Sequence, residues 1–338
     1  MPQIEASMRV THPFAEYVRT VARGATLSRP LTLDEAQAAM AMILDGRAEP
    51  SQVGAFLAVL RYRKETPEEL AGFVKAARFV LPSGPLSADL DWPSYADRHR
   101  QLPYFTLAAL LLASNGVRIL MHGLAGEGPA TTPKVLDALG AESSSSMDAA
   151  AASIAARNFA YLPIERLLPP LARLFDLRAI LGVRTSTNTF ARALNPSQAP
   201  AVMQGVFHPT YLPTHGELAR ILHQPRAAIF KGGGGEAQRN PEKLCRTVTL
   251  RDGTLTEEEW PAMTPRSAHP WREERRDPDE VVRLWRGERQ DSAPEAAVVG
   301  TVAIALKLLG RASTMEAAEA SAWAMWRGRD RVRMPLAG

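Results

Sequence analysis

Apolar residues recur at helical spacing through the first quarter of the chain, separated by short polar turns. Thr32 followed by Glu35, and Thr66 followed by Glu69, are capping-box pairs of the kind that starts a helix. A further predicted helix lies between these two and contains Pro50, Val53, Phe56, Leu57 and Leu60. Together the three helices predict a small N-terminal helical-bundle domain over residues 12–82.

Beyond residue 82, short apolar runs alternate with helical segments. Strands are predicted at residues 117–121, 159–162, 200–206, 227–230 and 247–250. Helices are predicted at residues 106–115, 165–181, 296–309 and 315–326. Residues 257–291, rich in Pro, Trp and charge, are expected to loop across the surface. Because strands alternating with helices form parallel sheets, we expect the α/β fold class, with a central, mostly parallel sheet flanked by helices. This larger domain is expected to comprise residues 83–164 and 191–336, with residues 165–190 packing back onto the helical domain.

Composition narrows the class of protein. The chain has 338 residues, 46% of them apolar and 22% charged, which is typical of a soluble globular protein. The longest strongly apolar run, residues 107–113, is far shorter than the roughly 20 residues of a membrane span. Cys245 is the one cysteine, which excludes an intrachain disulfide and a cysteine-rich zinc site. The first residues lack the basic and apolar segments of a signal peptide, so we expect a cytoplasmic location and no membrane partner.

Charge leaves two interpretations open. The sequence carries 40 Lys and Arg against 36 Asp and Glu, a net charge of +4, with a pI near 9.4. A basic protein is a candidate for nucleic-acid binding, but solvated arginines explain so small an excess equally well. Local clusters are more informative. Arg98, His99 and Arg100 follow one another, and Tyr95 nearby is a candidate for stacking on a base.

Three stretches together carry a resemblance to a known family. The first, in the helical domain, includes Leu31, Glu35, Gly46, Gln52, Gly54, Arg61, Glu65, Thr66 and Gly72. The second is His122-Gly123 with Val135, Leu136 and Gly140, and the third contains Leu181, Gly182, Arg184, Thr185, Asn188, Asn195, Pro196 and Gly205. The chain therefore resembles glycosyltransferase family 3, of the nucleoside phosphorylase and phosphoribosyltransferase class. That resemblance implies a helical domain joined to an α/β phosphoribosyltransferase domain.

The departures from the family pattern lie at its phosphate and metal positions. The anthranilate phosphoribosyltransferases of the family have a glycine-rich segment where this chain has residues 94–98, which contain no glycine. Glycines there let backbone N–H groups approach a pyrophosphate closely. Met121 stands where a lysine is expected, and Gly235-Glu236 replaces an Asp-Glu pair. Glu236 is the remaining candidate ligand for Mg²⁺, an ion usually held by one or two carboxylates and substrate phosphates.

A second set of residues resembles a paralogous subgroup of the family. It includes Asp91, Trp92, Pro93, Tyr95, Arg100, Pro103, Phe207, His208, Pro209, Tyr211, Lys231 and Glu236. Resemblance to that subgroup implies a homodimer that binds single- or double-stranded DNA and RNA without marked sequence preference. No cofactor is then expected, and Mg²⁺ is expected only if transferase activity persists.

The candidate site residues follow from these patterns and resemblances. Candidates for contact with nucleic acid or phosphate are Arg61, Arg63, Lys64, Tyr95, Arg98, His99, Arg100, Arg157, Arg178, Arg184 and Lys231. Candidates for a degenerate substrate site are His122, Gly123, Asn188, Gly233, Gly234 and Gly235. Arg61, Arg63 and Lys64 end a helix, where cations also offset the helix dipole, and His122 is as compatible with a satisfied core histidine. Asp91 and Asp97 are possible local partners for the arginines at 98 and 100.

Two functions therefore compete. The first is non-specific binding of DNA or RNA through arginine-lined clefts of a homodimer, on a scaffold whose phosphoribosyl pyrophosphate site is degenerate. The second is an active phosphoribosyltransferase that acts on anthranilate or another aromatic acceptor with Mg²⁺ and phosphoribosyl pyrophosphate. Three replacements at phosphate and metal positions favour the first.

Overall fold

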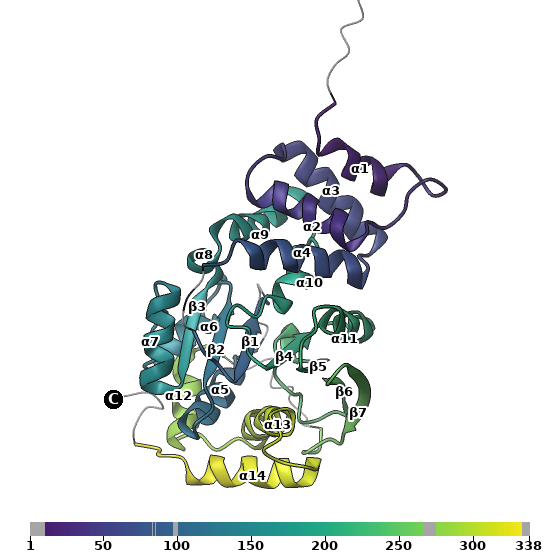
Figure 1. Cartoon of the computed structure of the whole chain (residues 1–338). Coiled ribbons are helices and arrows are strands. Elements are labelled where there is room, and N and C mark those ends of the chain that lie inside the picture. The colour runs from purple at the N-terminus through teal and green to yellow at the C-terminus, as the bar shows by residue number, and fades with distance from the viewer. Residues whose placement is uncertain (1–10, 83, 85, 97–100, 267–274, 333–338) are drawn as a thin grey trace, which may run out of the picture.

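The computed structural model describes residues 11–82, 84, 86–96, 101–266 and 275–332. At one end of the molecule lies a helical domain (Figure 1). Its helices are α1 (Ala15–Ala22), α2 (Leu33–Leu44), α3 (Pro50–Arg63) and α4 (Pro67–Phe79). The three helices predicted in this region are present, and α1 is an additional one.

Both predicted capping boxes form. The Thr32 hydroxyl accepts the Glu35 N–H, and the Glu35 carboxylate accepts the Thr32 N–H in return. Thr66 and Glu69 repeat this exchange at the start of α4. Each box satisfies backbone N–H groups that have no partner inside the helix. Local sequence therefore sets where these two helices begin.

The second domain is built on a seven-stranded sheet in the order β3-β2-β1-β4-β5-β6-β7. The strands are β1 (Leu90–Ser94), β2 (Ile119–Gly123), β3 (Phe159–Pro163), β4 (Ala201–Val206), β5 (Arg226–Lys231), β6 (Cys245–Arg251) and β7 (Thr254–Trp260). The first five in chain order run parallel, whereas β6 and β7 are antiparallel to their neighbours. The predicted fold class, a helical domain plus an α/β domain with a mostly parallel sheet, is confirmed.

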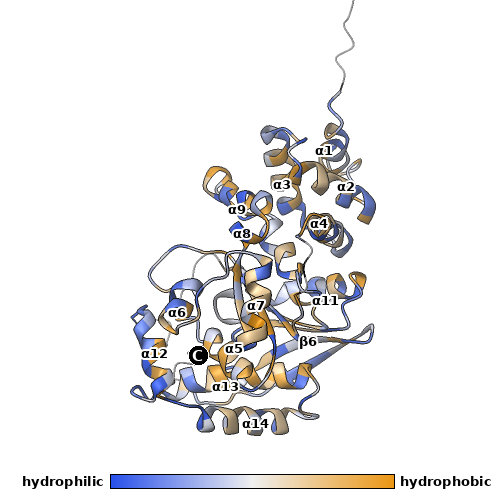
Figure 2. Ribbon diagram, turned by 60° about the vertical axis from the view of Figure 1, so that its left-hand side comes forward, coloured by the Kyte–Doolittle hydropathy of each residue, from blue (hydrophilic) through white to orange (hydrophobic). Residues whose placement is uncertain are grey.

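Helices cover both faces of this sheet. The described helices beyond α4 are α5 (Phe105–Ser114), α6 (Thr132–Ala138), α7 (Met147–Arg157), α8 (Ile164–Leu167), α9 (Pro169–Leu181), α10 (Thr187–Phe190), α11 (Leu212–Ile221), α12 (Pro278–Arg286), α13 (Ser292–Leu308) and α14 (Met315–Gly328). Helices α9 and α10 contact the helical domain rather than the sheet, and α14 packs on α13. Short 3₁₀ turns lie at Ala191–Ala193, Pro209–Tyr211 and Gly233–Gly235. Helices α5 and α13 are buried almost along their whole length and pack against each other, and Figure 2 shows them largely in the hydrophobic colour. Burial of these two helices removes a large apolar surface from water and so stabilises this domain.

The expectation of a surface loop over residues 257–291 was wrong for two segments. Strand β7 occupies the start of the region, and α12 occupies part of its second half. The strand has an exposed face, with Glu257 and Glu259, and a face turned to α13, with Glu258 and Trp260. A half-buried edge strand with three successive glutamates does not show the apolar alternation that predicts a strand.

A segment from the middle of the chain contacts the helical domain. Helix α9 contacts α3, with Leu181 against Gly54, and α10 contacts α4. The Phe190 ring also lies against the Phe73 ring, with centroids 5.6 Å apart. No helix in the described ranges combines the length and hydropathy needed to cross a bilayer.

Candidate functional site

The order of the strands places a crevice between β1 and β4. From β1 the chain proceeds to β2 and β3 on one side, and then to β4 and β5 on the other. Ligands of open α/β sheets bind outside the carboxyl ends of the strands at such a switch point. The segments at this edge are Tyr95-Ala96 after β1, Phe207-His208 after β4, and the glycine loop Gly232–Glu236 after β5.

The glycine loop is packed tightly against the strand ends. A Cβ at Gly205 would lie 2.1 Å from the main chain of Glu236, and one at Gly232 would lie 1.5 Å from the Glu236 carbonyl oxygen. Both positions therefore require glycine. The N–H groups of Gly232, Gly233 and Gly235 donate to the carbonyls of Val206, Gln238 and Gly232. These three amides are engaged within the protein, so they are not free to bind a substrate phosphate at the predicted degenerate site.

Glu236 is buried at the carboxyl ends of the strands, just after the glycine loop, with 2% of its surface exposed. Its Oε1 accepts the Ala96 N–H at 2.6 Å, whereas Oε2 has no hydrogen-bond partner. Burial raises the pKa of this carboxyl to about 7, although Arg192 and the Ala96 N–H both favour the charged form. The backbone N–H that follows β1 thus donates to a carboxylate of the protein itself. This N–H lies in the stretch where the family has its glycine-rich segment.

Arg192 is a residue that the sequence analysis missed. Its guanidinium donates to the carbonyl oxygens of Gly205 at 3.0 Å, of Gly235 at 3.2 Å and of Asn188. It therefore ties the ends of β4, the glycine loop and α10 together beside Glu236. No motif marks this arginine in the sequence, because its partners are main-chain oxygens from three distant segments.

Tyr95 and His122 belong to a buried polar chain. The Tyr95 hydroxyl lies 2.8 Å from His122 Nδ1, and His122 Nε2 lies 3.3 Å from Asp91 Oδ2. The Tyr95 ring stacks on Phe175 at an interplanar angle of 10°, and all but 1% of the residue is buried. The expectation that Tyr95 stacks on a base is therefore wrong for this structure, because Phe175 and the surrounding protein cover the ring. His122 is a satisfied core histidine.

A small cavity of about 70 Å³ opens where the crevice meets the helical domain. It is lined by Arg61, Tyr95, Arg184, Thr185, Asn188, Thr189, Arg192, Val206, Phe207, His208, Tyr211 and His215. Arg61 Nη1 donates to the Tyr211 hydroxyl at 2.6 Å and so links α3 to the turn before α11. Of the predicted residues, the cavity brings together Arg61, Arg184, Asn188 and Tyr95.

Other predicted cations lie elsewhere. Arg63 forms an ion pair with the buried Glu69, which commits its charge inside the helical domain. Arg157 ends α7 two residues before β3 begins, so it lies at the amino end of the sheet, opposite the crevice. Arg178 is on α9 and does not line the cavity. Lys64 and Lys231 are exposed, and Arg98, His99 and Arg100 fall outside the described residues.

The metal prediction rests on one carboxylate. Within the described residues no three His, Cys, Asp or Glu side chains form a cluster that could hold a metal ion. The unpartnered Oε2 of Glu236 is a suitable oxygen ligand, and Mg²⁺ accepts one protein carboxylate when substrate phosphates supply the others. The site therefore fits Mg²⁺ together with a phosphorylated substrate, and does not fit Mg²⁺ held by the protein alone.

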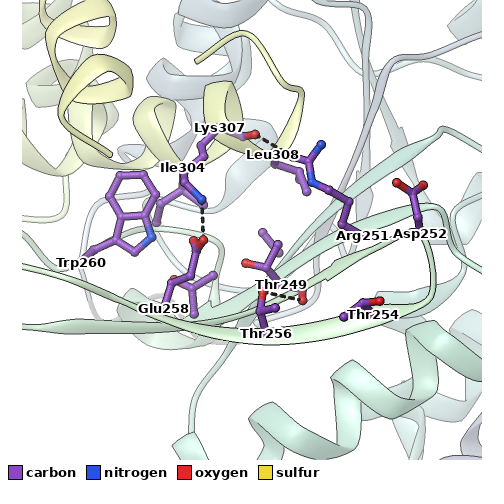
Figure 3. A pocket seen from close by; sticks show the side chains of 12 residues that line it. Thr249, Arg251, Asp252, Thr254, Thr256, Glu258, Trp260, Ile304, Lys307 and Leu308 are labelled. Carbon is purple, nitrogen blue, oxygen red and sulfur yellow. Dashed lines mark hydrogen bonds and ion pairs between the residues drawn. The ribbon is translucent and has the colours of Figure 1, made fainter. Parts of the chain in front are cut away.

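A different cavity, of about 400 Å³, lies between the β6–β7 hairpin and α13 (Figure 3). Lys307 pairs with Glu258 across it, and Arg251 donates to the Lys307 carbonyl oxygen. Thr249, Thr254 and Thr256 line the hairpin side. Because this cavity lies against the antiparallel end of the sheet, it does not share the switch-point geometry of the crevice.

Comparison with known proteins identifies the family. Residues 15–79 match the model of the glycosyl transferase family helical bundle domain, and residues 102–327 match the model of the glycosyl transferase family a/b domain. The chain belongs to glycosyl transferase family 3. The predicted family resemblance is thereby confirmed, while its nucleic-acid-binding subgroup remains a prediction.

The relatives of this family-3 chain include anthranilate phosphoribosyltransferases. The enzyme of Brevibacillus brevis is 30% identical over 237 residues, which cover 68% of each chain. The enzyme of Geobacillus kaustophilus is 29% identical over 299 residues, covering 85% of this chain and 87% of the relative. Among solved structures, anthranilate phosphoribosyltransferase from Thermus thermophilus has a TM-score of 0.77 at 23% identity over 94% of both chains. The Saccharomyces cerevisiae enzyme in complex with PRPP and Mg has a TM-score of 0.74 at 17% identity over 95% of both. These two structures share the fold.

Proposed function

We propose that this family-3 protein transfers a phosphoribosyl group from phosphoribosyl pyrophosphate to an aromatic acceptor. The observation that carries the proposal is a cationic and aromatic cavity at the switch point, between the two domains that match the family. Relatives named anthranilate phosphoribosyltransferase, of which one matches over 85% of this chain, support the reaction class. For this reason we place the transferase reaction ahead of the nucleic-acid interpretation.

In this proposal the chain's own residues orient the substrates. Arg61 and Arg184 would bind anionic groups of the acceptor or of the sugar phosphate, because guanidinium groups bind carboxylates and phosphates in a bidentate way. Phe207 and Tyr211 would form the apolar wall for an aromatic ring. Glu236 would leave the Ala96 N–H and supply one ligand to Mg²⁺, which would neutralise the pyrophosphate.

Nucleic-acid binding is the second candidate, and one observation favours it. The Ala96 N–H after β1 donates to the Glu236 carboxylate, so it is not open to a substrate phosphate as the N–H groups of a glycine-rich segment would be. A scaffold whose phosphate pocket is closed in this way, with Arg61, Arg184 and Arg192 beside it, would bind a phosphate backbone without chemistry. This candidate includes a homodimer, for which exposed Tyr62, Phe79 and Ile180 would supply apolar surface.

One paired experiment separates the two candidates. Anthranilate fluorescence is followed with phosphoribosyl pyrophosphate and Mg²⁺, and in parallel the anisotropy of a labelled oligonucleotide is measured from about 50 to 300 mM salt. The transferase proposal predicts turnover that falls at least tenfold in Arg184→Ala and is unchanged in the control Arg173→Ala, an exposed arginine of α9. Absence of turnover and of any heat of binding with phosphoribosyl pyrophosphate would overturn it. Salt-sensitive oligonucleotide binding that Arg184→Ala weakens would then establish the second candidate.

We also propose a cytoplasmic location, tested by fractionation of cells that express the protein.

A further inference from the structure

The cavity between the β6–β7 hairpin and α13, termed the hairpin cavity, lies outside the region used by the proposed reaction (Figure 3). Its volume of about 400 Å³ is that of a small-molecule site. The residues that line it come from β5, the hairpin and α13, and are Ala228, Thr247, Thr249, Arg251, Asp252, Thr254, Thr256, Glu258, Trp260, Ile304, Lys307 and Leu308. None of these described residues lines the interdomain cavity of about 70 Å³ beside the helical domain, so the two cavities are separate.

The hairpin turns a polar face toward this cavity. Thr249 of β6 and Thr256 of β7 are cross-strand neighbours on this face. On the opposite face of β6, Val248 and Leu250 are buried in an apolar cluster. A sheet face beneath a helix normally carries such apolar residues, so core packing does not explain the hydroxyls on the cavity side. A threonine hydroxyl both donates and accepts, which suits a ligand that carries hydroxyl groups.

The facing wall of the hairpin cavity is apolar. Ile304 and Leu308 lie about one turn apart on α13, and both line the cavity together with Ala228 of β5. A ligand that fits between the two walls therefore has hydroxyl groups on one side and C–H groups on the other. The ring of a sugar has this arrangement, with hydroxyls around its edge and C–H groups on its faces.

The charges of the hairpin cavity balance. Lys307 forms an ion pair with Glu258 between the helix and the hairpin (Figure 3). Arg251 and Asp252, where the hairpin turns, carry opposite charges, and Arg251 also donates to the Lys307 carbonyl oxygen at 3.3 Å. Two cations and two carboxylates leave no net charge, so the cavity as a whole has no net attraction for an ion. The balance favours a neutral ligand.

Trp260 supplies a second, independent observation. The residue is 1% exposed, and its indole Nε1 has no hydrogen-bond partner. Figure 3 shows the nitrogen edge of the ring turned toward the Lys307–Glu258 pair. The Arg239 guanidinium lies 5.1 Å from the ring centroid and donates to Glu319 at 2.7 Å, which holds the ring in place. A buried donor without an acceptor is costly, and a ligand hydroxyl in the cavity would accept this N–H.

We propose that the hairpin cavity binds a neutral molecule with several hydroxyl groups, of the size and chemistry of a monosaccharide. One ligand hydroxyl accepts the Trp260 N–H, and others exchange hydrogen bonds with the threonines of the hairpin. The C–H face of the ring packs on Ile304 and Leu308. The site lies at the antiparallel end of the sheet, so it rests on no step of the proposed reaction.

The test follows the indole N–H signals of the full chain, labelled with ¹⁵N-tryptophan, during titration with D-glucose and with D-ribose. Trp260→Phe identifies the Trp260 signal. We expect that signal to move downfield and to saturate, because the N–H gains an acceptor. Thr249→Val removes a hydroxyl and keeps the shape of the side chain, and it is expected to weaken D-glucose binding about fivefold. If Trp260→Phe does not fold, calorimetry of D-glucose binding to wild type and to Thr249→Val takes its place.

A matched pair of variants tests the preference for a neutral ligand. D-Glucuronate has the ring of glucose and a carboxylate, and wild type is expected to bind it more weakly than D-glucose. Glu258→Gln leaves Lys307 without its partner, so the ratio of the two dissociation constants should shift about tenfold toward glucuronate. The control is Glu257→Gln, on the exposed face of the hairpin, which should leave the ratio unchanged.

Three results would overturn the site. They are a Trp260 signal that does not move or does not saturate up to about 100 mM sugar, movement confined to other indole signals, and equal D-glucose affinity in wild type and Thr249→Val. Tighter binding of glycine or of inorganic phosphate than of either sugar would overturn the assigned class of ligand. Sugar binding at Trp260 in a chain without transferase turnover would refute the proposed reaction and leave this site intact.

Discussion

Two buried glutamates, one in each domain, differ in how completely the protein satisfies them. Glu69 in α4 accepts the Leu31 N–H and the Arg63 guanidinium at one oxygen and the Thr66 N–H at the other. Glu236 after β5 accepts the Ala96 N–H at one oxygen and nothing at the other. Both are almost inaccessible to solvent. Burial alone therefore does not distinguish them, but the number of partners does.

The difference distinguishes a carboxylate whose hydrogen bonds are satisfied within the fold from one that keeps an unpartnered oxygen. Glu69 joins the start of α2, the end of α3 and the first turn of α4, so its negative charge holds the helical domain together. Glu236 lies at the carboxyl ends of the strands, where ligands of this architecture bind, and keeps one oxygen without a hydrogen-bond partner.

Removal of Glu69 is expected to have the largest effect. In Glu69→Ala the half-buried Arg63 guanidinium and the backbone N–H groups of Leu31 and Thr66 lose their acceptor, which costs about 3 kcal/mol of unfolding free energy. Urea unfolding measures the loss. Glu68→Ala, one residue away and exposed, is the control and should change stability by less than about 0.5 kcal/mol. Similar small losses for both variants would contradict the structural role of Glu69.

The buried carboxyl of Glu236 predicts that the free energy of unfolding depends on pH. Since burial raises the pKa of its carboxyl from 4.5 to about 7, the folded state retains a proton that the unfolded state releases. Stability therefore falls as pH rises through this window, by an amount on the order of 3 kcal/mol from this group. Glu236→Gln should remove that fall while it keeps an acceptor for the Ala96 N–H. Unfolding between pH 4.5 and 7.5 checks this, and parallel curves for variant and wild type would refute it.

A smaller effect is expected from the polar chain next to this crevice. Tyr95→Phe removes the hydroxyl beside His122 Nδ1 and keeps the stacking on Phe175, so we expect a loss of about 1–2 kcal/mol. Thermal unfolding measures it. Because Tyr95 precedes Ala96, the variant also tests whether the hydrogen bond between the Ala96 N–H and Glu236 depends on the Tyr95–His122 interaction. An unchanged pH profile of stability would show that it does not.

The smallest effect is expected at a cap of the helical domain. Thr66→Ala removes the hydroxyl that accepts the Glu69 N–H but leaves the Thr66 N–H that Glu69 accepts. The expected cost is about 1 kcal/mol, typical of a lost N-cap. If urea unfolding showed a loss as large as that of Glu69→Ala, the hydroxyl rather than the carboxylate would be the main support of α4.

Much of the fold could be predicted because its signals are local. The boxes at Thr32 and Thr66 set two helix starts within four residues each, and five strands were visible as short apolar runs. Strand β1 was missed because Pro93 interrupts it, although it lies inside the sheet between β2 and β4. Strand β7 was missed because its glutamates face solvent or the Lys307 ammonium, which tertiary structure alone supplies.

The candidate site was predictable only in part. Arg61, Tyr95, Arg184 and Asn188 line the interdomain cavity, while their role there stays a prediction. Arg63 and Tyr95 also have internal partners that lie outside their motifs. No sequence motif marks Arg192 or Gln101. The Arg192 guanidinium binds main-chain oxygens, and the buried Gln101 Nε2 has no hydrogen-bond partner, so neither feature depends on a local sequence pattern. Such groups are recognised only once distant segments are brought together.

The close packing of Gly205 and Gly232 against the main chain of Glu236 has a consequence for motion. Because two flanking segments enclose that backbone, any departure of the carboxylate from the Ala96 N–H, as the proposed reaction requires, would take place by rotation about side-chain bonds. Such a rotation would need no movement of one domain against the other.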